Sequence, residues 1–445
     1  MTRARRKHTA AQAAELLARC VKLQNRLSSY WVEINSVATQ RFTRCLKRMR
    51  STSGSHENAR AIHTLWVDCA EQVYARVVHS KGFCKLQADL INTFSAIRLA
   101  GLSLPRELQL APGLSDAWRA ARGADEDSAG CSRKHVVWRQ DKVTLHRYER
   151  IASAVSVKPL LICFALVNRP YVLDLQPDRS FVRRLLSAGL DVYLIDWGYA
   201  DDDDRTLGLH DYIEGYLGSC VRHILDEHGS DSLNLVGVCQ GGTFSLCYTA
   251  LHPGHIRTLT TIATAVDFQT PADLLSKWSR GLDSKLLARA GNAPGEMMNA
   301  LFLSLLPFRL TQHKYVELLE QAHDAQYLEH FLRMETWIRD CPDQAAAALS
   351  QFVKWFYQEN RLARGTLRLG RRKVNLGHIV QPVLNIYATR DHIVPARASI
   401  PLQRMVGSSD YTAYATDTGH IGIFVSRANQ QVPQRIVDWL RTRNL

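Results

Sequence analysis

The chain has 445 residues, of which 46% are hydrophobic, and its formal net charge at pH 7 is +14. This composition is ordinary for a globular protein, and no apolar run reaches the roughly eighteen residues that a membrane-spanning helix needs. The amino end lacks the apolar region of a signal peptide, and the ten cysteines include no Cys-x-x-Cys pair that would indicate a zinc site. We therefore expect a reduced, cytoplasmic protein without a metal.

Most of the positive charge lies at the amino end. Residues 1–60 hold thirteen Lys or Arg and three Glu, so +10 of the +14 falls in this segment. We expect the basic run Arg3, Arg5, Arg6 and Lys7 to be a solvated tail, with contact to an anionic partner as the alternative. Because the remainder of the chain is nearly neutral, we do not expect the protein to bind nucleic acid.

Two long amphipathic helices are predicted in the first hundred residues. Apolar side chains recur at three- and four-residue steps between residues 10 and 50, and Ser51–Ser55 ends this helix. A second helical stretch with a similar apolar stripe is predicted from about Glu57 to Leu99. Two such helices joined by a short polar turn form an antiparallel hairpin, whose apolar face needs a partner.

The segment 113–134 has the composition of a flexible linker. Strands and helices alternate after it, which predicts an α/β domain with a mainly parallel, doubly wound sheet. The predicted strands are residues 160–166, 191–196, 233–238, 258–264 and 383–388, with helices such as 179–188 and 211–227 between them. The acidic run 201–204 follows one of these strands, and we expect its carboxylates to face water rather than to bind a metal.

The turn after the strand 233–238 carries the clearest chemical signal of the chain. This strand runs into Gly237-Val238-Cys239-Gln240-Gly241-Gly242, and small residues then open a helix. A strained turn that projects one side chain needs neighbours without bulk, which explains the glycines. The pattern is typical of a nucleophile elbow, so Cys239 is predicted to be a nucleophile for acyl groups. A buried structural cysteine is the alternative.

Between about residues 267 and 377 the alternation of strands and helices stops. This largely helical insertion is predicted to form a cap, which would cover the active site and exclude water from it. The apolar residues at 302–308 either pack in the cap's own core or line a path for the product.

An acid and a histidine follow the cysteine in the chain order of hydrolases built on such an elbow. Asp391 lies in the loop after the strand 383–388, and His420 follows the strand-like run 411–415. The carboxyl ends of parallel strands are where such sites form. Cys239, Asp391 and His420 are therefore predicted to be a catalytic triad.

Two other residues compete for these roles. His392 adjoins the acid, but neighbouring residues in an extended loop point in different directions, so we expect His392 to support the loop. Asp417 lies only three residues from His420 and has no strand directly before it, which makes it the weaker candidate for the acid.

At these residues the chain resembles the polyhydroxyalkanoate synthases, in particular the catalytic subunit of the two-component class III enzymes. The resemblance covers roughly residues 136–445. It rests on six motifs in the family's order, namely Ala165–Tyr171, Asp174–Gln176, Asp191–Gly198, Gly237–Gly242, Asp391–Pro395 and Gly419–Gly422. It implies an α/β-hydrolase fold with a helical cap insertion.

The resemblance also implies a reaction. The enzyme would polymerise (R)-3-hydroxyacyl-coenzyme A (CoA), with 3-hydroxybutyryl-CoA as the expected monomer, at a cytoplasmic granule, releasing CoA without a cofactor. His420 would deprotonate Cys239, which would then hold the acyl group as a thioester. Asp391 would either orient His420 or help to activate the 3-hydroxyl. The oxyanion would be held by the backbone N–H groups of Gln240 and Val167, in the loop that also contains Asn168. A homodimer is expected from the family.

The amino-terminal helices resemble the carboxyl-terminal part of the separate accessory subunit of the same enzyme class, at residues 66–74 and 102–108. A natural fusion would make a separate accessory subunit unnecessary, and an unrelated helical extension is the alternative. The expected organisation is a helical unit at 1–112, a linker at 113–134 and a catalytic domain at 135–445 with its cap at about 267–377.

Two other functions remain open on the sequence. The first is a thioesterase or polyester depolymerase with a cysteine nucleophile, because a triad does not specify whether water or a hydroxyl accepts the acyl group. The second is a non-catalytic granule scaffold, which the basic helical unit favours. A scaffold has no need of three reactive residues in order, which weighs against it.

Overall fold

The computed structural model describes residues 3–52, 59–102, 130–153, 155, 157–271, 273–426 and 431–444. The chain divides into two compact units. Unit 1 comprises Met1–Leu110, Leu274–Gly291 and Asn299–Leu332, and unit 2 comprises Ala111–Asp273, Asn292–Met298 and Arg333–Leu445. The helical insertion is thus shared between the two units. Residues 113–129 of the predicted linker lie outside the described residues, and Lys134 begins a strand.

Unit 2 contains an eight-stranded sheet in the order β1-β2-β4-β3-β5-β6-β9-β10. Six strands run parallel, and β1 and β2 form an antiparallel hairpin whose second strand pairs antiparallel with β4. The strands are β1 (Lys134–Gln140), β2 (Val143–Tyr148), β3 (Leu160–Cys163), β4 (Val192–Asp196), β5 (Leu233–Val238), β6 (Ile256–Ile262), β9 (Val383–Ala388) and β10 (Tyr411–Thr416). The mainly parallel sheet confirms the predicted fold class, whereas the hairpin β1-β2 was not predicted.

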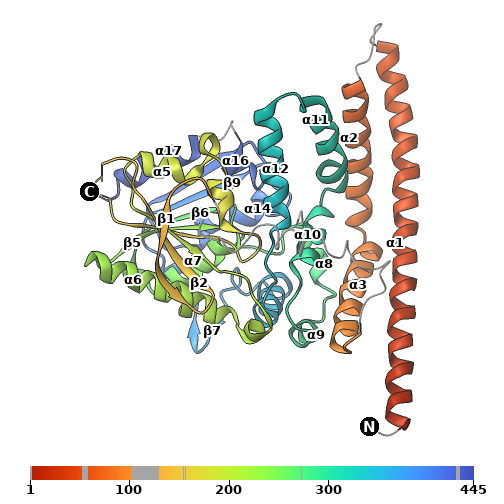
Figure 1. Ribbon diagram of the computed structural model, residues 1–445, viewed down its shortest axis with the longest axis horizontal. Helices are drawn as coiled ribbons and strands as arrows, with labels where there is room; N and C mark the ends of the chain where they lie inside the picture. The colour runs from red at the N-terminus through yellow and green to blue at the C-terminus, as the bar shows by residue number, and fades with distance from the viewer. Residues whose placement is uncertain are drawn as a thin grey trace. The chain divides into compact units, whose positions relative to one another are not determined.

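Helices cover both faces of this sheet (Figure 1). One face packs against α5 (Phe181–Ser187), α16 (Gly422–Val425) and α17 (Gln431–Arg441), and the other packs against α6 (Gly218–His228) and α7 (Gln240–Leu251). Alternate residues of β3 supply the two cores, Leu160 and Ile162 to the first and Leu161 and Cys163 to the second. Because both faces are covered, every residue of the central strands β3 and β5 is buried, and only Asn234 among them has a polar side chain.

Helices predominate between β6 and β9, where the sequence predicts the largely helical insertion. They are α8 (Leu274–Ser279), α9 (Ser284–Arg289), α10 (Gly295–Leu303), α11 (Lys314–Gln321), α12 (Ala325–Arg339) and α13 (Ala346–Phe352), with π-helical turns at Phe308–His313 and Val353–Gln358. A two-stranded ribbon of β7 (Arg368–Leu369) and β8 (Arg372–Lys373) follows them.

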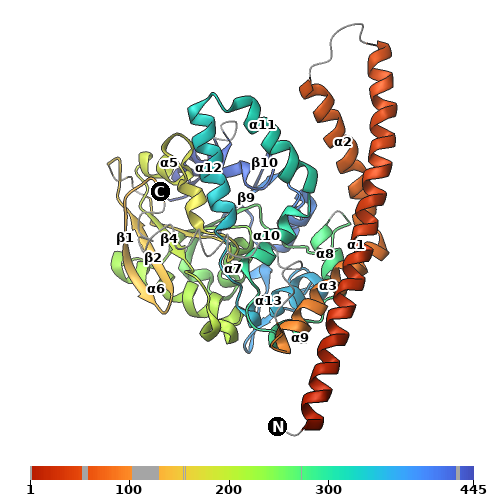
Figure 2. The same ribbon diagram turned by 45° about the vertical axis from the view of Figure 1, so that its right-hand side comes forward.

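Unit 1 is built around α1 (Arg3–Thr52), with α2 (Ala59–Val78) and α3 (Lys81–Leu99) running along it (Figures 1 and 2). The single helix predicted from Glu57 to Leu99 is therefore wrong, because it is two helices. The hydroxyl of Ser80 accepts a hydrogen bond from the Phe83 N–H and so starts α3 with a side-chain cap. Among the described residues, no helix has the length and apolarity to cross a membrane.

The accessory-like helices of unit 1 share a core with parts of the insertion. The Glu71 carboxylate accepts a hydrogen bond from the Arg309 N–H at 2.8 Å, and Tyr74 donates to the Ser304 carbonyl. The Phe308 ring lies 6.3 Å from that of Tyr74, centroid to centroid, and is 3% exposed. Of the two alternatives for residues 302–308, the structure thus places Phe308 in a packed core.

A second contact links α3 to the insertion within unit 1. The ring centroids of Phe83 and Trp278 are 6.3 Å apart, and both side chains are buried. The Asn92 amide donates to the Gly281 carbonyl and its oxygen accepts from the Asp283 N–H, each at 2.9 Å. The insertion therefore supplies a face to the apolar stripe for which the sequence predicted a partner.

The acidic run 201–204 is only partly as expected. Asp201 caps a short 3₁₀ helix at Asp202–Thr206, but the Asp204 side chain is buried and accepts from the Lys142 ammonium at 2.5 Å. The expectation that all four carboxylates face water is wrong for Asp204, because the cation on the β1-β2 hairpin compensates its burial.

Candidate active site

Cys239 stands in the strained turn between β5 and α7. Its backbone angles are φ +54° and ψ −121°, a conformation that a residue with a side chain adopts only when its surroundings impose it. A Cβ at Gly241 would lie 2.2 Å from the Cys163 carbonyl oxygen, and one at Gly242 would lie 1.9 Å from the Thr264 hydroxyl oxygen. The turn can therefore form only because glycines allow the helix to approach β3 and β6 this closely.

Asp391 and His420 meet at the carboxyl ends of the neighbouring strands β9 and β10. The His420 Nδ1 lies 2.6 Å from the Asp391 Oδ2, and the Asp391 side chain is fully buried. The other carboxylate oxygen, Oδ1, accepts from the backbone N–H groups of Ile393 at 2.8 Å and Val394 at 2.9 Å. These three hydrogen bonds fix the carboxylate, and the carboxylate in turn fixes the imidazole.

Cys239 lies close enough to His420 to raise the pKa of its imidazole, so the structure brings all three predicted residues together. Burial alone lowers the pKa of an imidazole, but Asp391 and Cys239 together raise the pKa of His420 well above its ordinary value. The ring therefore takes up a proton readily. A general base for a neighbouring thiol needs this property.

Neither competing residue takes the role of acid or base. The Asp417 side chain is 82% exposed and forms an ion pair with Arg390, so it does not hold His420. His392 is half-buried beside Asp391, and burial lowers its pKa to about 4. Because of this low pKa, the His392 imidazole does not hold an added proton at neutral pH.

The low pKa of His392 predicts a loss of stability in acid. Because its pKa is lower in the folded state than in the unfolded state, the unfolded chain binds more protons below pH 6.5. We expect the free energy of unfolding to fall by about 2 kcal/mol from this group between pH 7.5 and pH 5. Urea unfolding of the wild type and of His392→Gln at both pH values measures this, and an equal loss in both proteins would contradict it.

The loop after β3 lies beside the first residue of α7. The Leu166 N–H donates to the Gln240 side-chain oxygen at 3.0 Å. The Val167 N–H is the next backbone donor of the loop, and no described residue accepts a hydrogen bond from it. The same holds for the Gln240 N–H at the start of α7, so both predicted oxyanion donors are available to a ligand.

The sequence did not single out the residues that hold this loop. Gln344 donates to the Leu166 carbonyl at 3.1 Å, and the Trp337 indole N–H donates to the Arg169 carbonyl at 2.7 Å. Both lie in the insertion, where no motif draws attention to them. Only the three-dimensional fold brings them to the loop.

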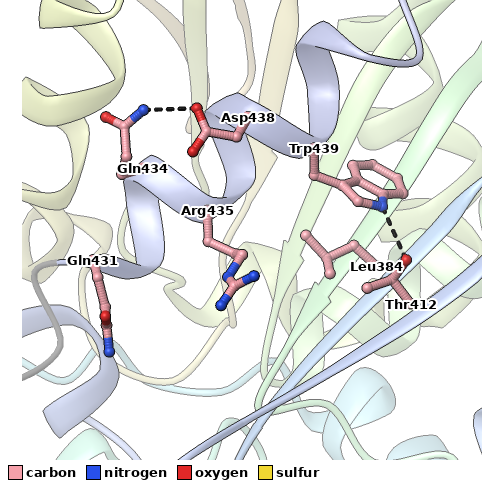
Figure 3. A pocket seen from close by; sticks show the side chains of 7 residues that line it. All are labelled: Leu384, Thr412, Gln431, Gln434, Arg435, Asp438 and Trp439. Carbon is pink, nitrogen blue, oxygen red and sulfur yellow. Dashed lines mark hydrogen bonds between the residues drawn. The ribbon is translucent and has the colours of Figure 1, made fainter.

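A cavity of about 340 Å³ lies away from these residues (Figure 3). It is lined by Leu384, Thr412, Gln431, Gln434, Arg435, Asp438 and Trp439. Leu384 and Thr412 are near the amino ends of β9 and β10, whereas the triad is at the carboxyl ends. Trp439 donates to the Thr412 hydroxyl at 3.2 Å, which closes one side of the cavity. No three His, Cys, Asp or Glu side chains of the described residues are grouped as a metal site requires.

Three families match parts of the chain, and the ranges of two of them overlap. Residues 158–426 match the family described as "alpha/beta hydrolase fold". Residues 126–185 match the "Poly-beta-hydroxybutyrate polymerase (PhaC) N-terminus". Residues 5–106 match the "Poly(R)-hydroxyalkanoic acid synthase subunit" family, which agrees with the resemblance of the helical segment to an accessory subunit.

Several curated relatives share a name. The poly(3-hydroxyalkanoate) polymerase subunit PhaC of Allochromatium vinosum is 49% identical over 324 residues, which cover 72% of this chain and 91% of that subunit. The subunits of the same name from Thiocystis violacea and Synechocystis sp. are 47% and 42% identical; each match covers 72% of this chain, and 91% and 88% of the respective subunit. The chain thus belongs to the PhaC family of poly(3-hydroxyalkanoate) polymerases, with an α/β-hydrolase domain that follows a segment similar to a synthase subunit.

Proposed function

We propose that this chain is a poly(3-hydroxyalkanoate) polymerase that transfers (R)-3-hydroxyacyl groups from CoA to a growing polyester through a thioester on Cys239. One observation carries the proposal. Cys239 stands in a strained turn beside His420, which Asp391 holds at 2.6 Å, in a chain that covers 91% of a polymerase subunit.

In the acylation step, His420 takes the proton of the Cys239 thiol, and the sulfur attacks the thioester carbonyl of the monomer. The carbonyl oxygen becomes an oxyanion, which the N–H groups of Gln240 and Val167 stabilise. The carbon–sulfur bond to CoA then breaks, and the CoA thiolate takes the proton from His420. One thioester replaces another, so this exchange has little thermodynamic cost.

In the transfer step, a 3-hydroxyl group attacks the thioester on Cys239. His420 takes the hydroxyl proton, the new oxoester bond forms, and the cysteine sulfur leaves and recovers the proton. Passing an acyl group from a thioester to an alcohol is downhill, which drives chain growth.

The surroundings of Asp391 favour an orienting role over direct activation of the hydroxyl. Its side chain is fully buried, one oxygen bonds His420, and the other accepts from two backbone N–H groups. To reach a substrate hydroxyl it would have to give up one of these bonds.

The test is to incubate the purified protein with 3-hydroxybutyryl-CoA and to measure released CoA, insoluble polymer and free acid. We expect CoA and polymer in stoichiometric amounts. Accumulation of free 3-hydroxybutyrate without polymer would identify a thioesterase instead. Longer 3-hydroxyacyl-CoA substrates in the same assay test the proposed preference for a short monomer.

We further propose that residues 1–110 serve as a built-in accessory subunit, because they match a synthase subunit family and share a core with the insertion. Assays of the single purified chain test this, since it should polymerise without a second protein. Association with the polymer granule and a homodimer are also proposed, from the family. Sedimentation of the protein with polymer granules tests the association. Analytical ultracentrifugation of the free protein tests the homodimer.

A further inference from the structure

The loop after β3 takes its shape from residues 337–344, which comprise the end of α12 and most of the connection to α13. Within unit 2, the Trp337 indole N–H donates to the Arg169 carbonyl at 2.7 Å, and the Gln344 amide donates to the Leu166 carbonyl at 3.1 Å. Trp337 and Gln344 are 5% and 4% exposed. Hydrogen bonds made in such a water-poor setting hold their partners firmly, because no solvent competes for them.

Asn168 makes further hydrogen bonds from the loop to α12. Its side-chain amide donates to the carbonyls of Trp337 at 3.3 Å and Ile338 at 3.2 Å. Both carbonyls belong to the last turn of α12, where the backbone supplies few donors; the Trp337 carbonyl also accepts from the Asp340 N–H at 3.1 Å. Asn168 therefore caps α12 from the loop, while Trp337 of α12 bonds the loop in return.

The backbone of Asn168 is adapted to this contact. Its φ is +60°, in the left-handed region that asparagine tolerates better than most residues. This conformation turns the chain sharply directly after Val167. The Val167 N–H is left without an acceptor among the described residues, although the N–H of Leu166 directly before it is bonded.

We propose that Asn168 and Trp337 are positioning residues that together aim the Val167 N–H at the oxyanion. This inference rests on the proposed function, in which Val167 is the second oxyanion donor. Such a donor must lie about 2.7–3.1 Å from the oxyanion, and its complete loss lowers kcat by about 100- to 1000-fold. Neither side chain touches the reacting atoms, so the effect passes through the position of the backbone.

Three variants separate the backbone conformation from the side-chain bonds. Asn168→Gly keeps the left-handed conformation without strain but lacks the amide. Asn168→Asp places a carboxylate against two carbonyl oxygens, which repel it. Trp337→Phe keeps an aromatic ring and removes only the donor to Arg169. We expect kcat for CoA release to fall about 100-fold in Asn168→Asp and about 10-fold in the other two, with KM changed less than twofold.

The matched control is Asp141→Gly. Asp141 also has a left-handed backbone, φ +51°, but lies in the tight turn between β1 and β2. We expect its kcat to equal that of the wild type. Circular dichroism and thermal unfolding of every variant measure the folded fraction, and Asn168→Gly remains informative if Asn168→Asp does not fold.

The outcomes distinguish the inference from the function on which it rests. A wild-type enzyme that releases no CoA contradicts the proposed function itself. If the wild type is active, variants at Asn168 and Trp337 that keep kcat within twofold overturn only the positioning role. A kcat that falls merely in proportion to the folded fraction also overturns the positioning role. So does a change in KM alone.

Discussion

Replacing Cys239 with alanine is expected to abolish both acylation of the enzyme and synthesis of polymer. The sulfur is the atom that bonds the acyl group, and removing a nucleophile from a triad lowers kcat by about a million-fold. Mass spectrometry of the intact protein after mixing with 3-hydroxybutyryl-CoA measures the first effect. We expect an added acyl mass on the wild type and none on Cys239→Ala.

The chain offers a matched control among its other cysteines. Cys220 in α6 is fully buried, and burial raises the pKa of its thiol well above the ordinary value, so it is not a nucleophile. We expect Cys220→Ala to retain acylation and polymer synthesis. An acyl adduct that persists in Cys239→Ala, or polymer made by that variant, would refute the proposed intermediate.

The elbow and the candidate triad could be predicted because their signals are local. Gly241 and Gly242 are required by backbone and side chains within 2.2 Å of the missing Cβ atoms, and the sequence shows this need as a run of glycines. Asp391 and His420 each follow a strand, and the carboxyl ends of parallel strands meet at one edge of a sheet. A local pattern therefore implied a non-local contact.

Other features depend on partners that the sequence does not place. Asp204 is buried because Lys142, 62 residues earlier, compensates it. Trp337 contacts a loop 168 residues away, and no periodicity in the insertion points to that contact. The break at Ser80 was missed because the apolar stripe continues on both sides of it, and only the side-chain cap marks the new helix. In each case a tertiary contact outweighs the local pattern.

Removal of residues 1–110 is expected to lower polymerisation at least about tenfold while the sheet of unit 2 still folds. The deletion would expose Trp278 and Phe308, which are 2% and 3% exposed in the full chain. Burial of such a side chain stabilises by about 1.5–3 kcal/mol, so the insertion segments of unit 1 would lose much of their stability. Unit 2 keeps its own two cores on either side of the sheet.

Three measurements test the expected effects of this deletion. Circular dichroism should report a folded α/β core, limited proteolysis should cut the truncated chain between residues 274 and 332, and CoA release should be slow. Adding residues 1–110 as a separate chain should restore protection and activity together, since both depend on the same core. In the full chain, Val32→Ser is the control because Val32 is 70% exposed on α1, and it should behave as the wild type. A truncated protein with full activity would show that the helices are a dispensable extension rather than a built-in accessory subunit.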